Sequence, residues 1–369
     1  MGKLRIFEGK RVLVTGNTGF KGSWLVEWLL HLKADVIGFA NDIPSNPSHF
    51  AISGMEGRIH QTWGDVRKFH EIHELIAKNK PDFVFHLAAQ ALVKKSYLEP
   101  RSTFETNVLG TLNVLDSLRI CNERCTAVII TSDKCYDNIE QEWGYRENDQ
   151  LGGKDPYSGS KGAAELVIRS YAASYFKKQT SNIRIGIGRA GNVIGGGDWA
   201  ADRIVPDAVR AWGHGDILDI RSPNSTRPWQ LVLEPLSGYL NLAVCLEENP
   251  ALNGEAFNFG PAAEQNKTVK DLLDEMGRHW PDAHWRDISD KTANYEAGLL
   301  KLNCDKALSR LGWKPTLKFE ETVKMTSDWY KKYYIADDAA SSDGIHALSV
   351  GQIAEYEGLA KQRGVTWAL

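Results

Sequence analysis

Residues 10–22 read KRVLVTGNTGFKG, a short β-branched run followed by glycines at positions 16, 19 and 22. The run predicts a buried strand, and apolar residues at helical spacing over residues 20–32 predict a helix. A glycine turn between a strand and a helix lets the backbone approach a pyrophosphate, which binds to the open N–H groups of the helix. The segment therefore predicts a dinucleotide site, and the alternative is a tight turn that binds no ligand.

Strand-like and helix-like segments alternate through the first half of the chain. Further strands are expected at residues 35–40, 83–87, 127–131 and 183–189, and long helices at residues 100–121 and 156–176. Such alternation is typical of right-handed βαβ units and a parallel sheet. We expect a doubly wound α/β Rossmann domain over residues 1–190 that takes back part of 231–258.

The second half of the chain has shorter elements and a glycine-rich loop at residues 195–197. Residues 191–369 are expected to form mainly a smaller α/β substrate domain over the carboxyl edge of the sheet, where ligands bind in open α/β folds. Within this part the sequence predicts helices at 305–311, 319–334 and 349–363, and a loop at 337–344.

Composition limits the class of protein. The 369 residues carry 44 Lys and Arg against 47 Asp and Glu, a net charge of −3 that argues against a nucleic-acid partner. The sequence has no apolar run of membrane-spanning length, and residues 1–10 do not resemble a signal peptide. Five sparse cysteines indicate reduced thiols. These features predict a cytoplasmic enzyme with no membrane partner.

The end of the second expected strand bears on the choice of cofactor. A carboxylate is expected there to bind the adenosine ribose, yet residues 40–42 read Ala-Asn-Asp and the acid is absent or displaced. Residues 40–50 contain no Arg or Lys to bind a ribose 2′-phosphate, so NAD is favoured over NADP. Asp65 and Val66 resemble a contact to the adenine edge; the alternative for Asp65 is an ordinary turn residue.

Tyr157 and Lys161 lie four residues apart, on one face of the helix expected at 156–176. A neighbouring ammonium favours the phenolate, which makes the tyrosine a usable base. Ser132 ends the preceding strand, where its hydroxyl can orient the tyrosine or a substrate. Asp133 and Lys134 follow it, and their alternative interpretation is a solvated pair in a loop.

Taken together, these segments resemble the extended short-chain dehydrogenase/reductase family that acts on nucleotide sugars. The resemblance spans residues 8 to about 335 and rests on TGNTGFKG (15–22), HLAAQ (86–90), NVLGT (107–111), YSGSK (157–161) and FNFG (257–260). Three more segments resemble the subgroup that dehydrates CDP-D-glucose: TSDKCY (131–136), RAGNVIGGGDW (189–199) and RPWQ (227–230).

The resemblance implies a reaction in which C4 of the sugar is oxidised, water leaves across C5 and C6, and hydride returns to C6. Tyr157, its pKa lowered by Lys161 and the nicotinamide charge, would take the C4 hydroxyl proton, and Ser132 would hydrogen-bond the same oxygen. Asp133 would act as the acid at C6. Lys134 stands where dTDP-glucose dehydratases have a glutamate base, so it is either the C5 base or an electrostatic stabiliser of the enolate.

The resemblance also assigns binding residues, and no metal. Those assigned to NAD are Gly16, Thr18, Gly19, Phe20, Lys21, Gly22, Asp65, Val66, Leu87, Ala88, Ala89 and Asn107, with Tyr157 and Lys161. Those assigned to the substrate, CDP-glucose, are Gln90, Asn192, Arg203, Arg227 and Asn258. An arginine suits the diphosphate because its guanidinium bonds two phosphate oxygens at once.

Several alternatives stay open. A C4 epimerase needs Tyr157 and Lys161 but no acid–base pair for C5 and C6, so Asp133 and Lys134 favour dehydration. The remaining alternatives are dehydration of another nucleotide-bound glucose, a redox-sensing NAD-binding protein without chemistry, and a structural or interaction module, which neither composition nor motif supports. The resemblance further implies a homodimer built from the helices at 100–121 and 156–176, and a product that leads to 3,6-dideoxyhexoses of a bacterial surface polysaccharide.

Overall fold

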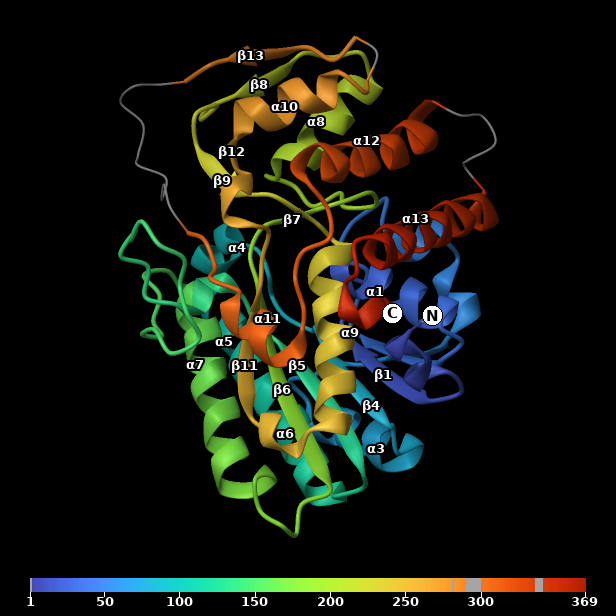
Figure 1. Ribbon diagram of the computed structural model, residues 1–369, viewed down its shortest axis with the longest axis vertical. Coiled ribbons are helices and arrows are strands. Elements are labelled where there is room, and N and C mark those ends of the chain that lie inside the picture. Colours follow the sequence, from blue (N-terminus) through green and yellow to red (C-terminus); the bar gives the residue numbers. More distant parts are fainter. Residues whose placement is uncertain (1, 281, 290–299, 336–340) are drawn as a thin grey trace.

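The computed structural model describes residues 2–280, 282–289, 300–335 and 341–369. Its centre is a seven-stranded parallel sheet in the order β11-β6-β5-β4-β1-β2-β3 (Figure 1). The strands are β1 (Arg11–Thr15), β2 (Asp35–Ala40), β3 (His60–Trp63), β4 (Phe83–His86), β5 (Cys125–Ile130), β6 (Ile183–Ala190) and β11 (Glu255–Phe259). The predicted doubly wound parallel fold is confirmed, because the order reverses on either side of β1 and every pairing is parallel.

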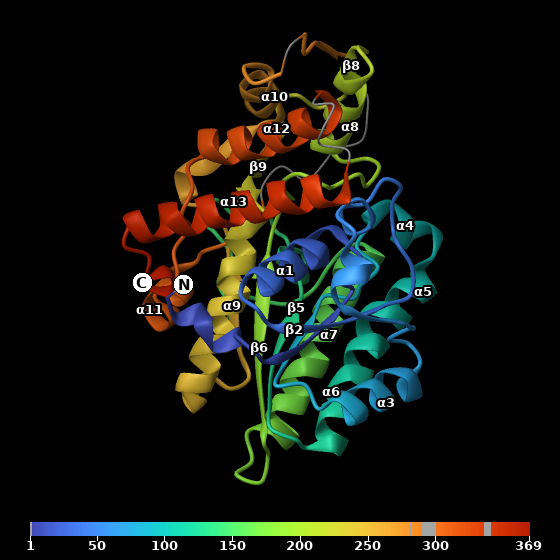
Figure 2. The same ribbon diagram turned by 90° about the vertical axis from the view of Figure 1, so that its right-hand side faces the viewer.

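Helices cover both faces of this sheet, and the alternation of side chains along β1 shows why. Val12 and Val14 join one hydrophobic cluster, and Leu13 joins the other, because successive strand residues point to opposite faces. The first face carries α1 (Phe20–His31) and α9 (Leu233–Glu248). The second face carries α3 (Phe69–Asn79), α6 (Gly110–Cys121) and α7 (Pro156–Tyr171) (Figure 2).

The two long helices predicted at 100–121 and 156–176 are confirmed, and each contains one π-helical turn. In the first, α5 (Pro100–Phe104) continues through the π turn Glu105–Leu109 into α6. In the second, α7 continues into the π turn Ala172–Phe176. The strand β11 adds to the edge of the sheet beside β6, so a segment remote in sequence completes the sheet.

The remaining elements lie mostly beyond the carboxyl ends of the strands (Figure 1). The helices are α2 (His49–Ile52), α4 (Val93–Leu98), α8 (Ile204–Gly213), α10 (Val269–Gly277), α11 (Asp305–Leu311), α12 (Phe319–Ile335) and α13 (Ser342–Gln362). The strands are β7 (Val193–Ile194), β8 (Leu218–Ile220), β9 (Thr226–Pro228), β10 (Gln230–Leu231), β12 (Asn266–Thr268) and β13 (Trp285–Asp287), which pair as three two-stranded sheets. None of the helices in the described ranges combines the length and the apolar character needed to cross a bilayer.

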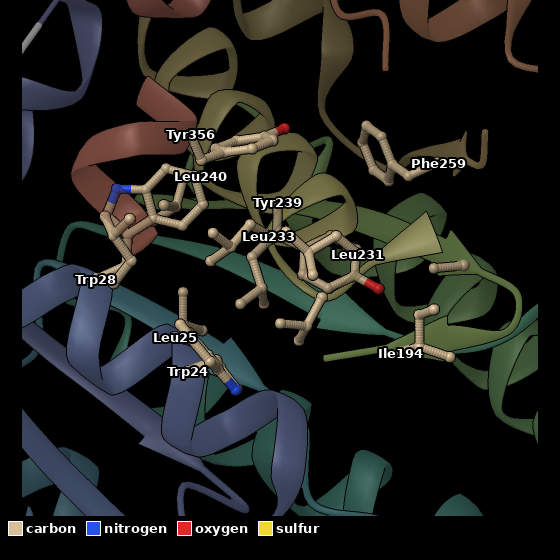
Figure 3. Close-up of a cluster of buried hydrophobic side chains, with 14 of the residues drawn as sticks. Trp24, Leu25, Trp28, Ile194, Leu231, Leu233, Tyr239, Leu240, Phe259 and Tyr356 are labelled. Atoms are coloured by element: carbon tan, nitrogen blue, oxygen red, sulfur yellow. The ribbon is translucent and has the colours of Figure 1, made fainter. Parts of the chain in front are cut away.

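The core on the first face joins α1, α9 and α13 (Figure 3). Trp28 of α1 is fully buried, and its ring lies 5.7 Å from the ring of Tyr356 on α13 in an edge-to-face arrangement. Tyr239 of α9 makes a similar contact with Phe259 of β11 at 5.6 Å. The C-terminal helix therefore covers the outer side of the helix that follows the glycine turn.

The loop predicted at residues 337–344 is partly wrong. Residues 337–340 lie outside the described residues, and α13 already begins at Ser342, seven positions before the predicted start of the final helix. The reason is local, because the side chain of Ser341 accepts a hydrogen bond from the N–H of Gly344 at 3.1 Å and caps the helix. The predicted helices at 305–311 and 319–334 are confirmed as α11 and α12.

Candidate active site

The glycine turn connects the end of β1 to the start of α1. Gly16 has a φ of 70°, and a Cβ there would lie 2.7 Å from the backbone of Ala88. A Cβ on Gly22 would lie 2.1 Å from the carbonyl oxygen of Gly16. Gly19 precedes α1 and brings no side chain to cap it, so the first N–H groups of the helix stay open to an anion. The cradle fits a dinucleotide pyrophosphate.

The ribose end of the turn has no carboxylate on the last residue of β2, which is Ala40. Thr18 donates its hydroxyl proton to the carbonyl of Asp42 at 2.7 Å, and Nδ2 of Asn17 donates to Oε1 of Gln61 at 2.7 Å. Oδ1 of Asn17 is buried and has no hydrogen-bond partner among the described residues. A buried acceptor without a partner is rare.

Asp65 and Val66 follow β3 and are engaged with neighbouring protein groups. Burial works to raise the pKa of Asp65, but hydrogen bonds and charge from Arg67 outweigh it and lower the pKa. Val66 is buried, and its carbonyl accepts a hydrogen bond from the amide of Asn113 on α6 at 2.8 Å. A Cβ on Gly110 would lie 2.8 Å from the Val66 side chain, which fixes the close approach of α6.

Asn107 holds the loop after β4 against α7. Its Oδ1 accepts from the N–H of Gln90 at 2.8 Å, and its Nδ2 donates to the Gln90 carbonyl at 3.0 Å and to Oγ of Ser160 at 2.8 Å. The side-chain amide of Gln90 is bonded to Leu92 and Thr103, so it is committed to the loop. The predicted cofactor residues Leu87, Ala88 and Ala89 follow β4 directly, beside the glycine turn.

Tyr157 and Lys161 lie in the first turns of α7. Asp155 caps the helix by accepting from the N–H of Ser158 at 3.0 Å, and Pro156 follows the cap with its φ preset for a helix. The start of the helix fixes both side chains on one face. Only 8% of Tyr157 and 6% of Lys161 is exposed, so both side chains act in a nearly dry site.

The protein's own groups do not lower the pKa of Tyr157 as the resemblance implied. Burial raises that pKa to about 12, opposed by the nearby hydroxyl of Ser132 and by the charge of Arg203. Burial also lowers the pKa of Lys161 to about 8. The tyrosine therefore holds its proton tightly until additional positive charge comes near it.

Ser132 and Asp133 lie in the turn that follows β5, and their side chains are bonded to each other. Oγ of Ser132 donates to Oδ1 of Asp133 at 2.8 Å and accepts from the N–H of Lys134 at 3.2 Å. Burial raises the pKa of Asp133, while Lys134 and Ser132 oppose the shift. A raised pKa makes a buried carboxyl better suited to hold a proton and to serve as a general acid.

Two lysines bring positive charge to Asp133. Lys134 is half-buried, and Lys21 lies in the first turn of α1. Burial lowers the pKa of Lys21 to about 8, Asp133 raises it, and Arg203 and Lys161 lower it further. Neither ammonium has a hydrogen bond or ion pair within the described residues. The sequence assigned Lys21 to the cofactor alone, whereas the structure places its charge among the catalytic groups.

Three of the predicted substrate residues lie in the segments that follow β6. Arg203 precedes α8, and its Nη1 lies 2.8 Å from Oδ2 of Asp198. Its charge also lowers the pKa of Tyr157, so the two side chains are near each other. Asn192 is half-buried between β6 and β7, and Arg227 lies in β9.

Asn258, which the resemblance assigns to the substrate, has its side-chain amide bonded to protein groups. Its side chain is completely buried in β11. Its Oδ1 accepts from the hydroxyl of Tyr136 at 2.8 Å, and its Nδ2 donates to the carbonyls of Tyr145 and Asn303 at 2.8 and 3.1 Å. Because protein groups occupy the whole amide, Asn258 joins three remote segments behind the site.

A buried ion pair that sequence reasoning missed supports the turn after β5. Arg189 and Glu165 are fully buried, 2.7 Å apart, and Glu165 also accepts from the hydroxyl of Thr131 at 2.6 Å. Arg189 donates to the hydroxyl of Tyr136 at 2.6 Å. The pair fixes the end of β5 to α7, and so holds Ser132 beside the tyrosine. The available signal was an arginine ending a buried strand, which requires an acid partner.

The parts of the site converge because β1, β4 and β5 are neighbours in the sheet. Their carboxyl ends bring together the glycine turn, the Asn107 loop and the Ser132 turn, with α7 alongside. No group of three or more His, Cys, Asp or Glu residues in the described ranges could hold a metal ion. This sheet, this turn and this Tyr–Lys pair define a Rossmann-fold enzyme of the short-chain dehydrogenase/reductase type.

Comparison with known proteins narrows the class. The chain belongs to the GDP-mannose 4,6 dehydratase family, whose sequence pattern matches residues 13–326. It is 46% identical over 336 residues to the CDP-glucose 4,6-dehydratase of Salmonella typhimurium, covering 90% of this chain and 93% of that protein. It is thereby identified as a close relative of a sugar-nucleotide dehydratase.

Solved structures share the fold. The dTDP-glucose 4,6-dehydratase of Streptomyces venezuelae, determined with NAD and TYD bound, superposes with a TM-score of 0.72 at 24% identity, covering 88% of this chain and 99% of that one. The UDP-glucose 4-epimerase of Thermotoga maritima, determined with UDP-glucose, gives a TM-score of 0.73 at 22% identity, with the same coverage. At these identities the superpositions establish the architecture alone.

Proposed function

We propose that the protein is a lyase that dehydrates CDP-D-glucose to CDP-4-keto-6-deoxy-D-glucose with NAD as cofactor. The observation that carries the proposal is a base and an acid at one edge of the sheet. Tyr157 and Lys161 suit proton removal from an alcohol, and Asp133 is a buried carboxyl whose raised pKa suits protonation of a leaving hydroxyl. The identity of 46% to a CDP-glucose 4,6-dehydratase supports the substrate.

The protein's groups divide the reaction between them. NAD, when bound, supplies the hydride acceptor for C4 and returns the hydride to C6. Tyr157 takes the proton of the C4 hydroxyl, and Ser132 holds the same oxygen. Asp133 gives its proton to the C6 hydroxyl, which leaves as water. The 4-keto group makes the C5 proton acidic, since the carbanion formed there is an enolate.

Lys134 is the candidate for handling the C5 proton. It follows Asp133 directly, and its charge acts on that carboxyl. Within the described residues its ammonium has no partner, so it is available to a ligand. Its role is either that of the base at C5 or that of a cation that stabilises the enolate while another group takes the proton.

The glycine turn supports NAD as the cofactor, with Gly16, Gly19 and Gly22 against the pyrophosphate and Asn107 holding the neighbouring loop. Because β2 ends in Ala40 and not in an acidic residue, the carboxylate that usually binds the adenosine ribose is missing at this position. We therefore expect the protein to retain NAD weakly and to need added cofactor after purification.

The smaller sheets support binding of the sugar nucleotide, with Arg203 and Arg227 for the diphosphate. On this proposal the Rossmann domain comprises residues 1–190 and part of 231–258, and the remainder of 191–369 binds the substrate. β11 and α9 pack with the sheet, which supports that division.

A homodimer is the proposed assembly. The helices α5–α6 and α7 keep large apolar side chains exposed, and an apolar surface of this kind favours a partner. The exposed residues on these helices and their π turns are Phe104, Leu109, Ile120, Leu166 and Tyr175. Replacement of Leu166, 59% exposed, by Glu is expected to yield monomers in sedimentation velocity. An unchanged sedimentation coefficient would contradict this interface.

The proposed setting is the bacterial cytoplasm, where the product would lead to 3,6-dideoxyhexoses of a surface polysaccharide. Composition and sparse cysteines support the compartment. The sugar assignment rests on the resemblance to CDP-glucose dehydratases.

Incubation with NAD⁺ and CDP-glucose deuterated at C4 tests the function. Loss of one water, with the deuterium recovered at C6, is the expected result by mass spectrometry and NMR. An unchanged mass with inverted C4 would instead identify a C4 epimerase. If only another nucleotide-bound glucose reacts, the proposed dehydration is retained and the assignment of cytosine as the nucleobase is wrong.

A further inference from the structure

Two residues of the HLAAQ and NVLGT segments have no part in the proposed chemistry, yet both are buried beside the site. His86 ends β4 and Thr111 lies in the first turn of α6, and their exposed fractions are 1% and 5%. Thr15 ends β1 and is paired with His86 in the parallel register of the two strands. Because side chains alternate along a strand, both strand residues point to the same face as Leu13 and Val84, the face that α6 covers.

The imidazole of His86 joins the two threonines. Its Nδ1 lies 2.7 Å from Oγ1 of Thr15, and its Nε2 lies 3.1 Å from Oγ1 of Thr111. Thr111 donates its one hydroxyl proton to the carbonyl of Asn107 at 2.8 Å, so it accepts from the ring. Nε2 of His86 therefore carries the proton, and Nδ1 accepts from the hydroxyl of Thr15. The opposite tautomer would leave the buried Thr15 hydroxyl without an acceptor among the described residues.

The Thr15 end of this arrangement supports the glycine turn. Oγ1 of Thr15 accepts a hydrogen bond from the N–H of Ala88 at 3.3 Å. The next residue, Gly16, approaches Ala88 so closely that a Cβ on it would lie 2.7 Å from the Ala88 backbone. The threonine that bonds to His86 therefore also holds the glycine turn against the loop after β4.

The Thr111 end reaches the helix that carries Tyr157. Asn107, whose carbonyl accepts from Thr111, donates from its Nδ2 to Oγ of Ser160 at 2.8 Å. Ser160 in turn donates to the carbonyl of Tyr157 at 2.7 Å. The side chains in this series from Thr15 to Ser160 are each exposed by 5% or less, so water does not compete for their hydrogen bonds.

We propose that His86 is a positioning residue that couples the glycine turn, where NAD binds, to the helix that carries Tyr157. The inference rests on the proposed function for the role of Tyr157. A buried network with every group bonded is rigid, and loss of one partner leaves a costly unpaired group. Hydride transfer requires the cofactor and the base in a fixed relative geometry. His86 therefore acts on catalysis through Thr15 and Thr111, and not by contact with the substrate.

The neutral state of the ring suits this position. Burial and, to a lesser extent, the charge of Lys161 lower the pKa of His86 to about 3. A charged ring would donate from both nitrogens, and the Thr15 hydroxyl would then lose its acceptor. The ring therefore keeps one arrangement of hydrogen bonds over the pH range in which ordinary histidines titrate.

Thr111→Val tests the coupling at the end remote from the glycine turn. It keeps the size of the side chain but leaves the Nε2–H of His86 buried without an acceptor. Calorimetric titration is expected to show NAD⁺ bound about tenfold more weakly, and kcat at saturating NAD⁺ and CDP-glucose should fall by about 10–10²-fold. The KM for CDP-glucose should change little, because the residues proposed for its diphosphate follow β6. Thr111→Ser keeps the hydroxyl and should restore both NAD⁺ affinity and kcat.

Thr326→Val on α12 is the matched control. Thr326 is completely buried and donates to the carbonyl of Thr322, four residues earlier, at 2.8 Å, the same bond that Thr111 makes to Asn107. The control should lower the midpoint of urea unfolding while leaving NAD⁺ affinity and kcat unchanged. A Thr111→Val variant that loses stability but keeps native NAD⁺ affinity and native kcat would overturn the proposal, since the role of His86 would then be structural alone.

His86→Phe, which removes both ring nitrogens, shows whether the effect of Thr111 passes through the imidazole. If it does, adding Thr111→Val to His86→Phe should not weaken NAD⁺ binding further. Two losses of affinity that multiply would show that Thr111 acts by another route, and would exclude the coupling.

A measurement on the unsubstituted protein covers a His86→Phe variant that does not fold. Nitrogen NMR of the histidine rings distinguishes protonation at Nδ1 from protonation at Nε2, and the His86 signals are identified by their change in Thr111→Val. Protonation at Nε2 alone is expected between about pH 5 and 8. Protonation at Nδ1, or titration within this range, would overturn the proposal. Failure of the unsubstituted protein to convert CDP-glucose would instead count against the proposed function, and the NAD⁺ affinities would still decide the coupling.

Discussion

Glu27, a completely buried carboxyl on α1, has its Oε2 2.6 Å from Nδ1 of His346 on α13. Burial raises the pKa of Glu27 to about 8, and burial also lowers the pKa of His346. Glu27 therefore keeps its proton to higher pH than a free carboxyl does, and burial disfavours a charge on either group. It joins the helix of the glycine turn to the C-terminal helix.

This pair predicts how stability depends on pH. A native pKa of Glu27 near 8, against 4.5 in the unfolded chain, means that the native state holds a proton the unfolded state has lost. Its contribution is complete below pH 4.5 and falls as pH rises to 8, by up to about 1.4 kcal/mol per pH unit. Urea unfolding at pH 5 to 8 should show Glu27→Gln with a flatter profile. Glu321→Gln, at a half-exposed pair with Arg363, is the control and should leave the slope unchanged.

Gly22→Ala should weaken NAD⁺ binding, because its Cβ would lie 2.1 Å from the Gly16 carbonyl that shapes the turn. Calorimetric titration with NAD⁺ is expected to show at least about a tenfold loss, equivalent to 1.4 kcal/mol. Gly358→Ala on α13, where a Cβ meets nothing within 4 Å, is the control. It should bind NAD⁺ normally and unfold at slightly higher urea, since alanine stabilises a helix by about 0.5–1 kcal/mol over glycine. Normal NAD⁺ binding by Gly22→Ala would refute the cradle.

Asp133→Asn should separate oxidation at C4 from loss of water. Without the acid, the reduced cofactor is expected to accumulate, seen by its absorbance, while product formation falls by about 10²–10⁴-fold. Asn keeps the hydrogen bond from Ser132 at similar volume, which makes it the conservative change. Product formed at the native rate would remove Asp133 from the role of acid.

Lys134→Met tests the C5 step alone. If Lys134 is the base, the variant should lose the wash-in of solvent deuterium at C5 while still oxidising C4. Wash-in that persists at the native rate would eliminate Lys134 as base and leave it the electrostatic role. NMR of the recovered sugar nucleotide in D₂O provides the measurement.

Arg189→Met should destabilise the protein by about 3–5 kcal/mol, because it leaves the carboxylate of Glu165 buried without its partner. The double variant Arg189→Met with Glu165→Leu removes both charges and should recover most of that loss in urea unfolding. Its catalytic rate should stay low, since Thr131 also loses its acceptor and the Ser132 turn loosens. Full recovery of rate would show that the pair acts on stability alone.

Short sequence patterns predicted those parts of the fold that depend on neighbouring residues in the chain. Short β-branched runs gave the central strands, and the glycine turn followed because Gly16 and Gly22 have no room for a side chain. Helix α9 was not foreseen, because residues 233–246 are buried on all sides and show no amphipathic period. Its position depends on tertiary packing that a linear pattern does not record.

The sequence predicted some features of the candidate site and not others. The motif gave Tyr157 and Lys161, because their spacing alone puts them on one helical face. It did not predict the hydrogen bonds of the Asn258 side chain. These bonds go to Tyr136, Tyr145 and Asn303, which lie in distant segments of the chain. The sequence assigned Lys21 to NAD but did not predict its nearness to Asp133, because Asp133 lies in the turn after β5, far away in the chain.

The seat of Gly196 beneath α12 has a consequence for the order of assembly during synthesis. A Cβ at Gly196 would lie 2.0 Å from the Trp329 ring, and Tyr330 donates its hydroxyl to the carbonyl of Asp198 at 2.5 Å. The loop that carries Arg203 is thus held by side chains translated more than a hundred residues later. A nascent chain that has exposed only the early strands and the glycine turn can form the cofactor cradle, whereas the Arg203 loop gains this packing only after Trp329 and Tyr330 have been translated.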